Sequence, residues 1–133
     1  MRIGIDCRGL KNNFMSGADR YLINFLKLAI RERPDHEFFL YGNQHSYLSN
    51  LNQSEYVLSA RLPAINLKDK KVTIKITPEW NTQWWDHVIL GKEAKKDKLD
   101  VFFSPFDKAS VLSPCPIIIT IHDPILFGTM FDK

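Results

Sequence analysis

One histidine of this chain stands where it could take part in chemistry. His122 follows a run of β-branched residues, 117–121, and precedes Asp123, whose carboxylate could orient the imidazole through a hydrogen bond. An imidazole held in this way can exchange a proton or bind a reacting group near neutral pH. A purely structural histidine at the end of a strand is the alternative, and the sequence leaves both open.

A second group of candidate residues lies near the start of the chain. Ser16 and Gly17 precede a segment with helical periodicity, and a helix N-terminus offers backbone amides and a partial positive charge to phosphate or sugar oxygens. A glycine there lets a ligand approach the backbone closely, although a loop that requires a positive φ would also explain it. We expect Asp19 to cap the helix together with Ser16 rather than to bind a ligand. Ser104 follows another short apolar run and is expected in a turn.

The elements that must position these groups alternate between strands and helices. The first helix should run from Ser16 to just before Pro34, with one apolar face. A second should begin at Thr77 and pack through Trp80, Trp84 and Val88, and we expect the tryptophans to form core and domain-contact surface rather than a sugar platform. Short apolar runs typical of buried strands occupy residues 3–6, 37–41, 56–58, 72–76, 101–103 and 117–121.

This alternation predicts an α/β fold, a Rossmann-like doubly wound and mainly parallel sheet. The strands at 3–6 and 117–121 should both be interior. Ligands of open α/β sheets bind outside the carboxyl ends of the strands. We therefore expect Gly17 and His122 to face one another across that edge.

Composition excludes several classes of protein. The chain has 133 residues, 44% hydrophobic and 25% charged, which fits one globular domain, and its formal charge of +3 is too small to indicate a nucleic-acid partner. Cys7 and Cys115 are too few for a disulfide scaffold, and the histidines show no metal-ligand spacing with them. The sequence has no Gly-x-Gly-x-x-Gly fingerprint, no phosphate loop and no apolar stretch long enough to span a membrane. We expect a cytoplasmic protein without metal or cofactor.

The motifs together resemble the N-terminal half of a family-4 glycosyltransferase of the GT-B fold. Residues 2–8 and 16–21 read RIGIDCR and SGADRY, similar to the family's RIGIDAR and SGIGRY. Residues 100–105 and 116–123 read DVFFSP and PIIITIHD, similar to DVFHSP and PVVVTIHD. The order and spacing of the family are kept over nearly the whole chain. The departures are at Asp19, Phe103 and Pro124, where the family commonly has glycine, histidine and leucine.

The resemblance implies transfer of a sugar from a nucleotide-sugar donor to a saccharide or glycoconjugate acceptor, with retention of configuration and without a metal. His122 matches the histidine that contacts the reacting sugar and is the catalytic candidate. Gly17 matches the glycine near the donor phosphates and the acceptor. The residues expected to bind substrate are thus Gly17, Ser16, Ser104 and Asp123. For the full enzyme, peripheral association with a membrane is a further expectation.

We expect residues 1–133 to form the N-terminal, acceptor-side domain, incomplete and without the C-terminal donor-binding domain. The family's donor site uses a Glu-x7-Glu pair, and the glutamates at 32, 37, 55, 79 and 93 include none with that spacing. We therefore expect a fragment of a longer enzyme, inactive alone and able to self-associate through its exposed cleft face. A non-catalytic partner subunit of the same fold and a small flavodoxin-like nucleotide or phosphate binder are the alternatives.

Overall fold

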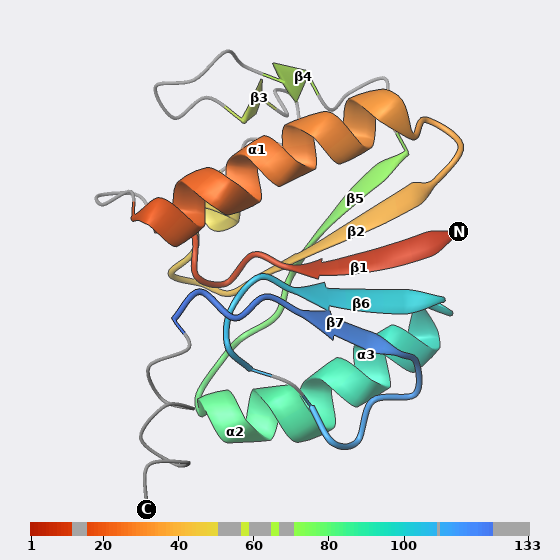
Figure 1. The fold of residues 1–133 in the computed structure, drawn as a ribbon. Coiled ribbons are helices and arrows are strands. Elements are labelled where there is room, and N and C mark those ends of the chain that lie inside the picture. Colours follow the sequence, from red (N-terminus) through yellow and green to blue (C-terminus); the bar gives the residue numbers. More distant parts are fainter. Residues whose placement is uncertain (12–15, 51–56, 59–64, 67–70, 109, 124–133) are drawn as a thin grey trace, which may run out of the picture.

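A five-stranded, all-parallel sheet forms the centre of the protein (Figure 1). The computed structural model describes residues 1–11, 16–50, 57–58, 65–66, 71–108 and 110–123. The sheet strands, in chain order, are β1 Arg2–Asp6, β2 Glu37–Gly42, β5 Val72–Ile76, β6 Val101–Ser104 and β7 Ile117–Ile119. Their order across the sheet is β5-β2-β1-β6-β7. The expected α/β, Rossmann-like parallel sheet is therefore confirmed.

The strand order also separates two related folds. Numbered along the chain, the sheet strands lie in the order 3-2-1-4-5, which is the usual Rossmann order. Flavodoxin-like sheets have the order 2-1-3-4-5. The flavodoxin-like alternative therefore does not describe this fold.

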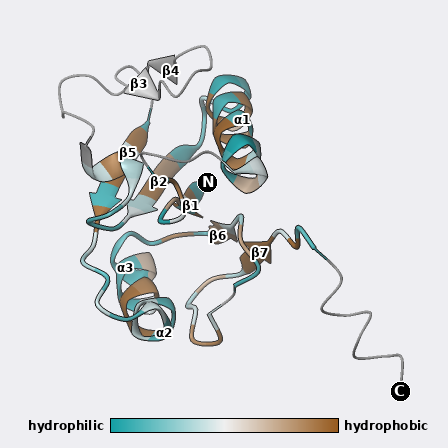
Figure 2. Cartoon of the chain, turned by 90° about the vertical axis from the view of Figure 1, so that its left-hand side faces the viewer, coloured by the Kyte–Doolittle hydropathy of each residue, from teal (hydrophilic) through white to brown (hydrophobic). Residues whose placement is uncertain are grey.

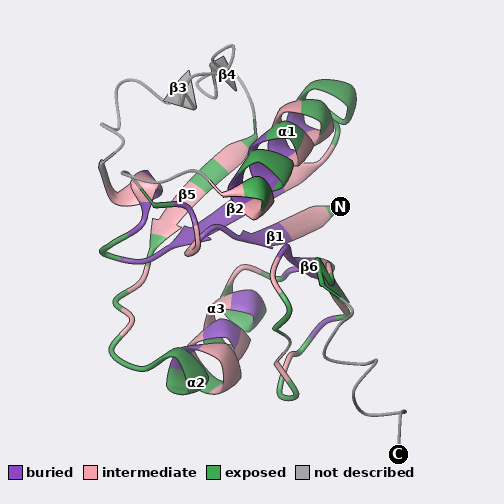
Figure 3. Cartoon of the chain, turned by 60° about the vertical axis from the view of Figure 1, so that its left-hand side comes forward, coloured by how far each residue is buried: buried purple, intermediate pink, exposed green. Residues whose placement is uncertain are grey.

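Helices cover both faces of the sheet, as the views in Figures 1 and 2 show. On one face lies α1 Gly17–Glu32, whose buried side chains pack with residues of β1, β2 and β6. On the other face one continuous helical unit consists of α2 Thr82–Trp84, a π-helical segment Trp85–Ile89 and α3 Leu90–Lys96. Buried residues concentrate on the interior strands of the sheet, β1, β2 and β6, and Figure 3 shows those of β1 and β2. In the described part of the chain, no helix is long and apolar enough to cross a membrane.

The connection from β2 to β5 carries small elements. They are a 3-10 helix at Tyr47–Asn50 and an antiparallel pair formed by β3 Val57–Leu58 and β4 Ile65–Asn66. The strand expected at 56–58 thus coincides with β3, whereas no sequence pattern indicated β4. Residue 56, the first of the strand expected at 56–58, lies outside the described residues.

Helix α1 begins as the sequence predicts. The Ser16 hydroxyl accepts a hydrogen bond from the Asp19 backbone N–H at 3.2 Å, and the Asp19 carboxylate accepts one from the Ser16 N–H at 2.7 Å. This capping box satisfies two N–H groups that helix formation would leave without partners. The helix ends at Glu32, before Pro34. Tyr21 in the first turns of this helix is 41% exposed, and it contacts His122.

The second helix begins later than the sequence predicts. Asn81, not Thr77, is the N-cap, and its side-chain oxygen accepts a hydrogen bond from the Trp84 N–H at 3.0 Å. Trp80 therefore precedes the helix and is exposed, as is Trp84, so the expected packed stripe of Trp80, Trp84 and Val88 is wrong. The buried tryptophan is instead Trp85, and its indole N–H donates to the Thr77 hydroxyl at 2.8 Å.

The position of β7 corrects a further expectation. Strand β1 is the central strand, as predicted, but β7 is the last strand in the described part of the sheet and pairs with β6. Ile118 and Ile119 are 56% and 41% exposed. The β-branched run predicted a strand correctly, but apolar composition alone cannot distinguish an interior strand from an apolar edge strand.

A substitution at Gly4 tests how closely the sheet is packed. A Cβ atom at this position would lie 2.5 Å from Leu99 Cδ1 and 2.7 Å from Phe102 Cδ2. Because overpacking a close-packed core forces neighbours to shift, Gly4→Ala should lower the free energy of unfolding by about 1–3 kcal/mol in urea denaturation. Gly17→Ala is the matched control, since a Cβ there meets nothing within 4 Å among the residues that the structure describes, and the stability of this variant should be unchanged or raised by up to about 1 kcal/mol. A Gly4→Ala protein as stable as the wild type would contradict this packing.

Candidate functional site

The carboxyl edge of the sheet is where a ligand crevice is expected. Strand β1 pairs with β2 on one side and with β6 on the other, so the strand order reverses between β1 and β6. In open α/β sheets ligands bind at such a switch point, outside the carboxyl ends of the strands. The segments that reach this edge include Asp6 to Arg8 after β1, Ser104 and Pro105 at the end of β6, and His122 beyond β7.

His122 is held in a defined orientation beside α1. Its Nε2 lies 2.6 Å from the carbonyl oxygen of Pro105, and its backbone N–H donates to Asp107 at 3.1 Å. Because a carbonyl oxygen can only accept, Nε2 carries the hydrogen of this bond. In the neutral imidazole Nδ1 is then the hydrogen-bond acceptor. The imidazole also makes an edge contact with Tyr21, with ring centroids 5.4 Å apart.

The structure brings the two ends of the candidate site close together. Tyr21 lies one helical turn beyond Gly17, so its contact with His122 joins the start of α1 to the segment after β7. The hydroxyls of Tyr21 and Thr120 lie 3.3 Å apart, which adds a second contact between these segments. The ring bond to Pro105 is one that the sequence did not predict.

The other predicted site residues have distinct positions. Among the described glycines none has a positive φ, so a strained loop conformation does not account for Gly17, which is exposed. Ser16 is engaged in the capping box. Ser104 is not in a turn as expected but is the last residue of β6; it is buried, and its hydroxyl donates to the Phe106 carbonyl at 3.1 Å. Asp123 is exposed beside His122.

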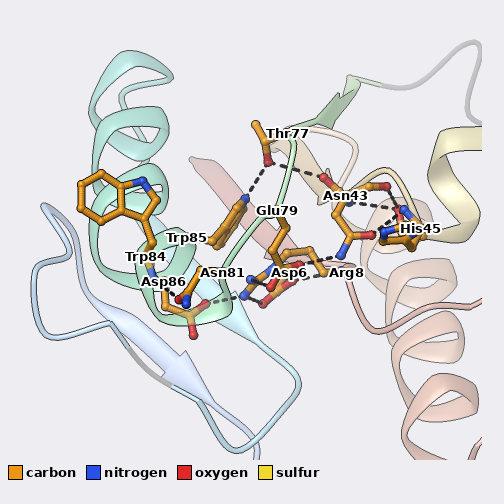
Figure 4. A network of polar contacts seen from close by, with 12 residues as sticks. Asp6, Arg8, Asn43, His45, Thr77, Glu79, Asn81, Trp84, Trp85 and Asp86 are labelled. Carbon is orange, nitrogen blue, oxygen red and sulfur yellow. Dashed lines mark hydrogen bonds and ion pairs between the residues drawn. The ribbon is translucent and has the colours of Figure 1, made fainter.

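Sequence reasoning missed the polar centre of this edge, which is Arg8 (Figure 4). Its guanidinium binds Asp6 through Nε at 3.0 Å and Nη2 at 2.7 Å, Glu79 through Nη1 at 3.0 Å, and Asp86 through Nη2 at 2.5 Å. The guanidinium carbon also lies 3.6 Å from the centre of the Trp85 ring. The Arg8 side chain is only 8% exposed. One cation therefore joins β1, the connection after β5, and the second helical unit.

Electrostatics explain why this arginine remains charged. Burial alone would lower the pKa of Arg8, but the hydrogen bonds and negative charges of Asp6 and Asp86 raise it above its ordinary value. Burial likewise acts to raise the pKa of Glu79. Hydrogen bonds from Asn43 and Thr82, together with the charges of Arg8 and Lys108, outweigh it and lower that pKa. Glu79 is thus charged at neutral pH. In the described ranges no group of three or more acidic, histidine or cysteine side chains could hold a metal ion.

A hollow of about 350 Å³ opens beside this centre. It lies where β2 ends and where the segment after β5 enters the second helical unit, and its lining comprises Arg8, Lys11, Asn43, His45, Glu79, Trp80, Asn81 and Thr82. No local pattern in the sequence joins these residues, because they come from three separate loops. The one signal in the sequence for this site is that Arg8 follows two residues after Asp6, the last residue of β1.

Comparison with protein-family models, curated proteins and solved structures finds no match for this chain.

Removing the Arg8 cation tests its role. Arg8→Met should lower the free energy of unfolding at pH 7 by about 3–5 kcal/mol, because it leaves the carboxylates near it without their cation. The pKa of Glu79 in the folded protein is below its value in the unfolded chain. The stabilisation that comes from the charged Glu79 is therefore present above the ordinary carboxyl range and is lost as the pH falls through the folded pKa. The difference in the free energy of unfolding between Arg8→Met and the wild type should therefore become smaller in acid.

The matched control is Arg20→Met, at an exposed arginine of α1. Its free energy of unfolding should stay within about 0.5 kcal/mol of the wild type. Equal losses in the two variants, or a gap for Arg8→Met that does not change with pH, would refute the role given to Arg8.

Proposed function

We propose that this chain is the acceptor-side, N-terminal half of a nucleotide-sugar glycosyltransferase of the GT-B fold. The observation that carries the proposal is the contact between Tyr21 and His122. These residues belong to SGADRY and TIHD, motifs at opposite ends of the sequence that resemble the same family. Their convergence on the carboxyl edge of a Rossmann-ordered sheet supports a shared site.

Each residue of this pair of motifs has a chemical role in the proposal. The His122 ring is oriented by Pro105, so its Nδ1 can accept a hydrogen bond from a sugar hydroxyl. The first N–H groups of α1 have no partner within the helix and carry the positive end of its dipole, which suits sugar or phosphate oxygens. Gly17 leaves space for such a group, since a Cβ there would meet no atom of the described residues within 4 Å.

The donor, in this proposal, is bound by a second domain. Transfer requires donor and acceptor to be held in reactive geometry, and that positioning can supply about 7–11 kcal/mol of the barrier reduction. The glutamates of this chain include no Glu-x7-Glu pair that would bind the donor. Retention of configuration and independence of metal are parts of the proposal that come from the resemblance.

The first test uses the complete reading frame that contains residues 1–133. His122→Ala should lower the transfer rate from a nucleotide sugar by about 10²-fold, the effect of losing one positioned group, with an unchanged melting temperature. Gly17→Val should weaken binding of donor or acceptor because it fills the space beside the helix start. Arg31→Ala, at an exposed position of α1, should leave transfer unchanged. Wild-type transfer by His122→Ala would leave the histidine with a structural role only.

The second test uses residues 1–133 alone. Incubated with a panel of nucleotide sugars and saccharide acceptors, this polypeptide should show neither transfer nor donor hydrolysis, and calorimetry should detect no tight nucleotide binding. The exposed Ile118, Ile119 and Ile121 leave apolar surface beside β7, so sedimentation should show self-association at high concentration. Turnover or tight nucleotide-sugar binding would favour a self-contained nucleotide-binding protein.

A further inference from the structure

The rim of the hollow beside Arg8 carries an unusual side chain. Trp80 is 93% exposed, whereas tryptophan is on average highly buried in folded proteins. It lines the hollow together with polar groups from the loops after β1 and β2. A large apolar ring facing water beside a concave polar surface is the arrangement of a ligand site rather than of a protein core.

The backbone that carries Trp80 is fixed on both sides. The Glu79 N–H donates to the Gln44 side-chain oxygen at 2.9 Å, and the Gln44 amide donates back to the Glu79 carbonyl at 3.1 Å. On the other side, Asn81 caps the second helical unit through its bond from the Trp84 N–H. The indole is therefore presented by an ordered segment, which lowers the entropic cost of using it to bind a ligand.

The cation in the floor of the hollow is already paired with carboxylates. One Glu79 oxygen accepts from Arg8 at 3.0 Å, and the other accepts from the Asn43 amide at 2.6 Å. Arg8 is in turn shared among three carboxylates. This pairing leaves little net positive charge for a phosphate, because the cation is already committed. Exposed Lys11 and His45 remain on the walls as hydrogen-bonding groups.

We propose that this hollow binds a neutral sugar ring of the acceptor, stacked on the indole of Trp80. Its volume of about 350 Å³ lies in the lower part of the range for small-molecule sites. The sugar hydroxyls would be bound by Lys11, His45 and Asn81. In calling the sugar an acceptor this inference rests on the proposed function, but sugar binding at Trp80 stands on the geometry of the hollow.

The hollow and His122 occupy different parts of the same edge. The hollow lies beyond β1, β2 and β5, and His122 lies beyond β7, so β6 separates them in the sheet. An acceptor with more than one sugar unit would then place one unit in the hollow, while a different unit reacts near His122. Binding energy from a remote unit can position the reacting group and so raise the rate of transfer.

The experiment measures binding of neutral sugars to residues 1–133. D-glucose, D-galactose, D-mannose, N-acetyl-D-glucosamine and maltotriose are titrated to high millimolar concentration while the indole N–H signals are followed by NMR. At least one sugar should shift the Trp80 signal in a saturable manner. Measured by calorimetry in both proteins, Trp80→Ala should weaken that binding at least about fivefold, the effect of losing one aromatic contact.

Trp84→Ala is the matched control, because Trp84 is also exposed and lies four residues away but does not line the hollow. It should bind the same sugar with unchanged affinity, and both variants should melt at the wild-type temperature. The inference fails if no sugar of the panel shifts the Trp80 signal, or if both variants lose binding equally. It also fails if inorganic phosphate or a nucleoside diphosphate binds at Trp80 and the neutral sugars do not.

The transfer assay and this binding assay can fail independently. Sugar binding at Trp80 without any transfer by the complete reading frame would remove the proposed function and retain the site. Transfer with no binding at Trp80 would retain the function and overturn the site.

Discussion

A single buried cation organises the carboxyl edge of this protein. Arg8 binds carboxylates from the end of β1, from the segment after β5 and from the second helical unit, and it stacks on the buried Trp85. Because each carboxylate belongs to a different segment, the guanidinium fixes their relative positions. Removing one partner of such a buried cluster is costly, since the remaining charges stay poorly solvated. The floor of the hollow, the position of Glu79 and the packing of Trp85 all depend on this arginine.

The same constraint shapes what the edge can bind. With the Arg8 charge committed to protein carboxylates, the polar surface offered to a ligand consists mainly of amide, imidazole and ammonium groups around an exposed indole. Farther along the edge, the His122 ring is held by the Pro105 carbonyl and Tyr21 next to the start of α1. One part of the edge suits recognition of a neutral sugar and the other suits contact with its reacting end. The acceptor domain that we propose would need both functions.

Local signals in the sequence were strong where a single segment determines its own structure. The capping box of Ser16 and Asp19 and the apolar strand at β1 are set by neighbouring residues, and both occur as predicted. The start of the second helix was misplaced, because Thr77 has the chemistry of an N-cap but its hydroxyl instead accepts a bond from Trp85. The Arg8 cluster joins residues far apart in the sequence, and no periodicity or spacing encodes it. The edge position of β7 likewise depends on which strands neighbour it, which composition does not specify.

The central claim is that the carboxyl edge of the sheet binds a saccharide acceptor. The most direct measurement is a map of backbone amide shifts by two-dimensional NMR as an oligosaccharide bound by the chain is titrated into residues 1–133. The claim predicts shifts at Glu79 and Asn81, at Gly17 and around His122, with none at the opposite edge near Glu37, where β2 begins. Shifts confined to that opposite edge, or spread evenly over the surface, would contradict it.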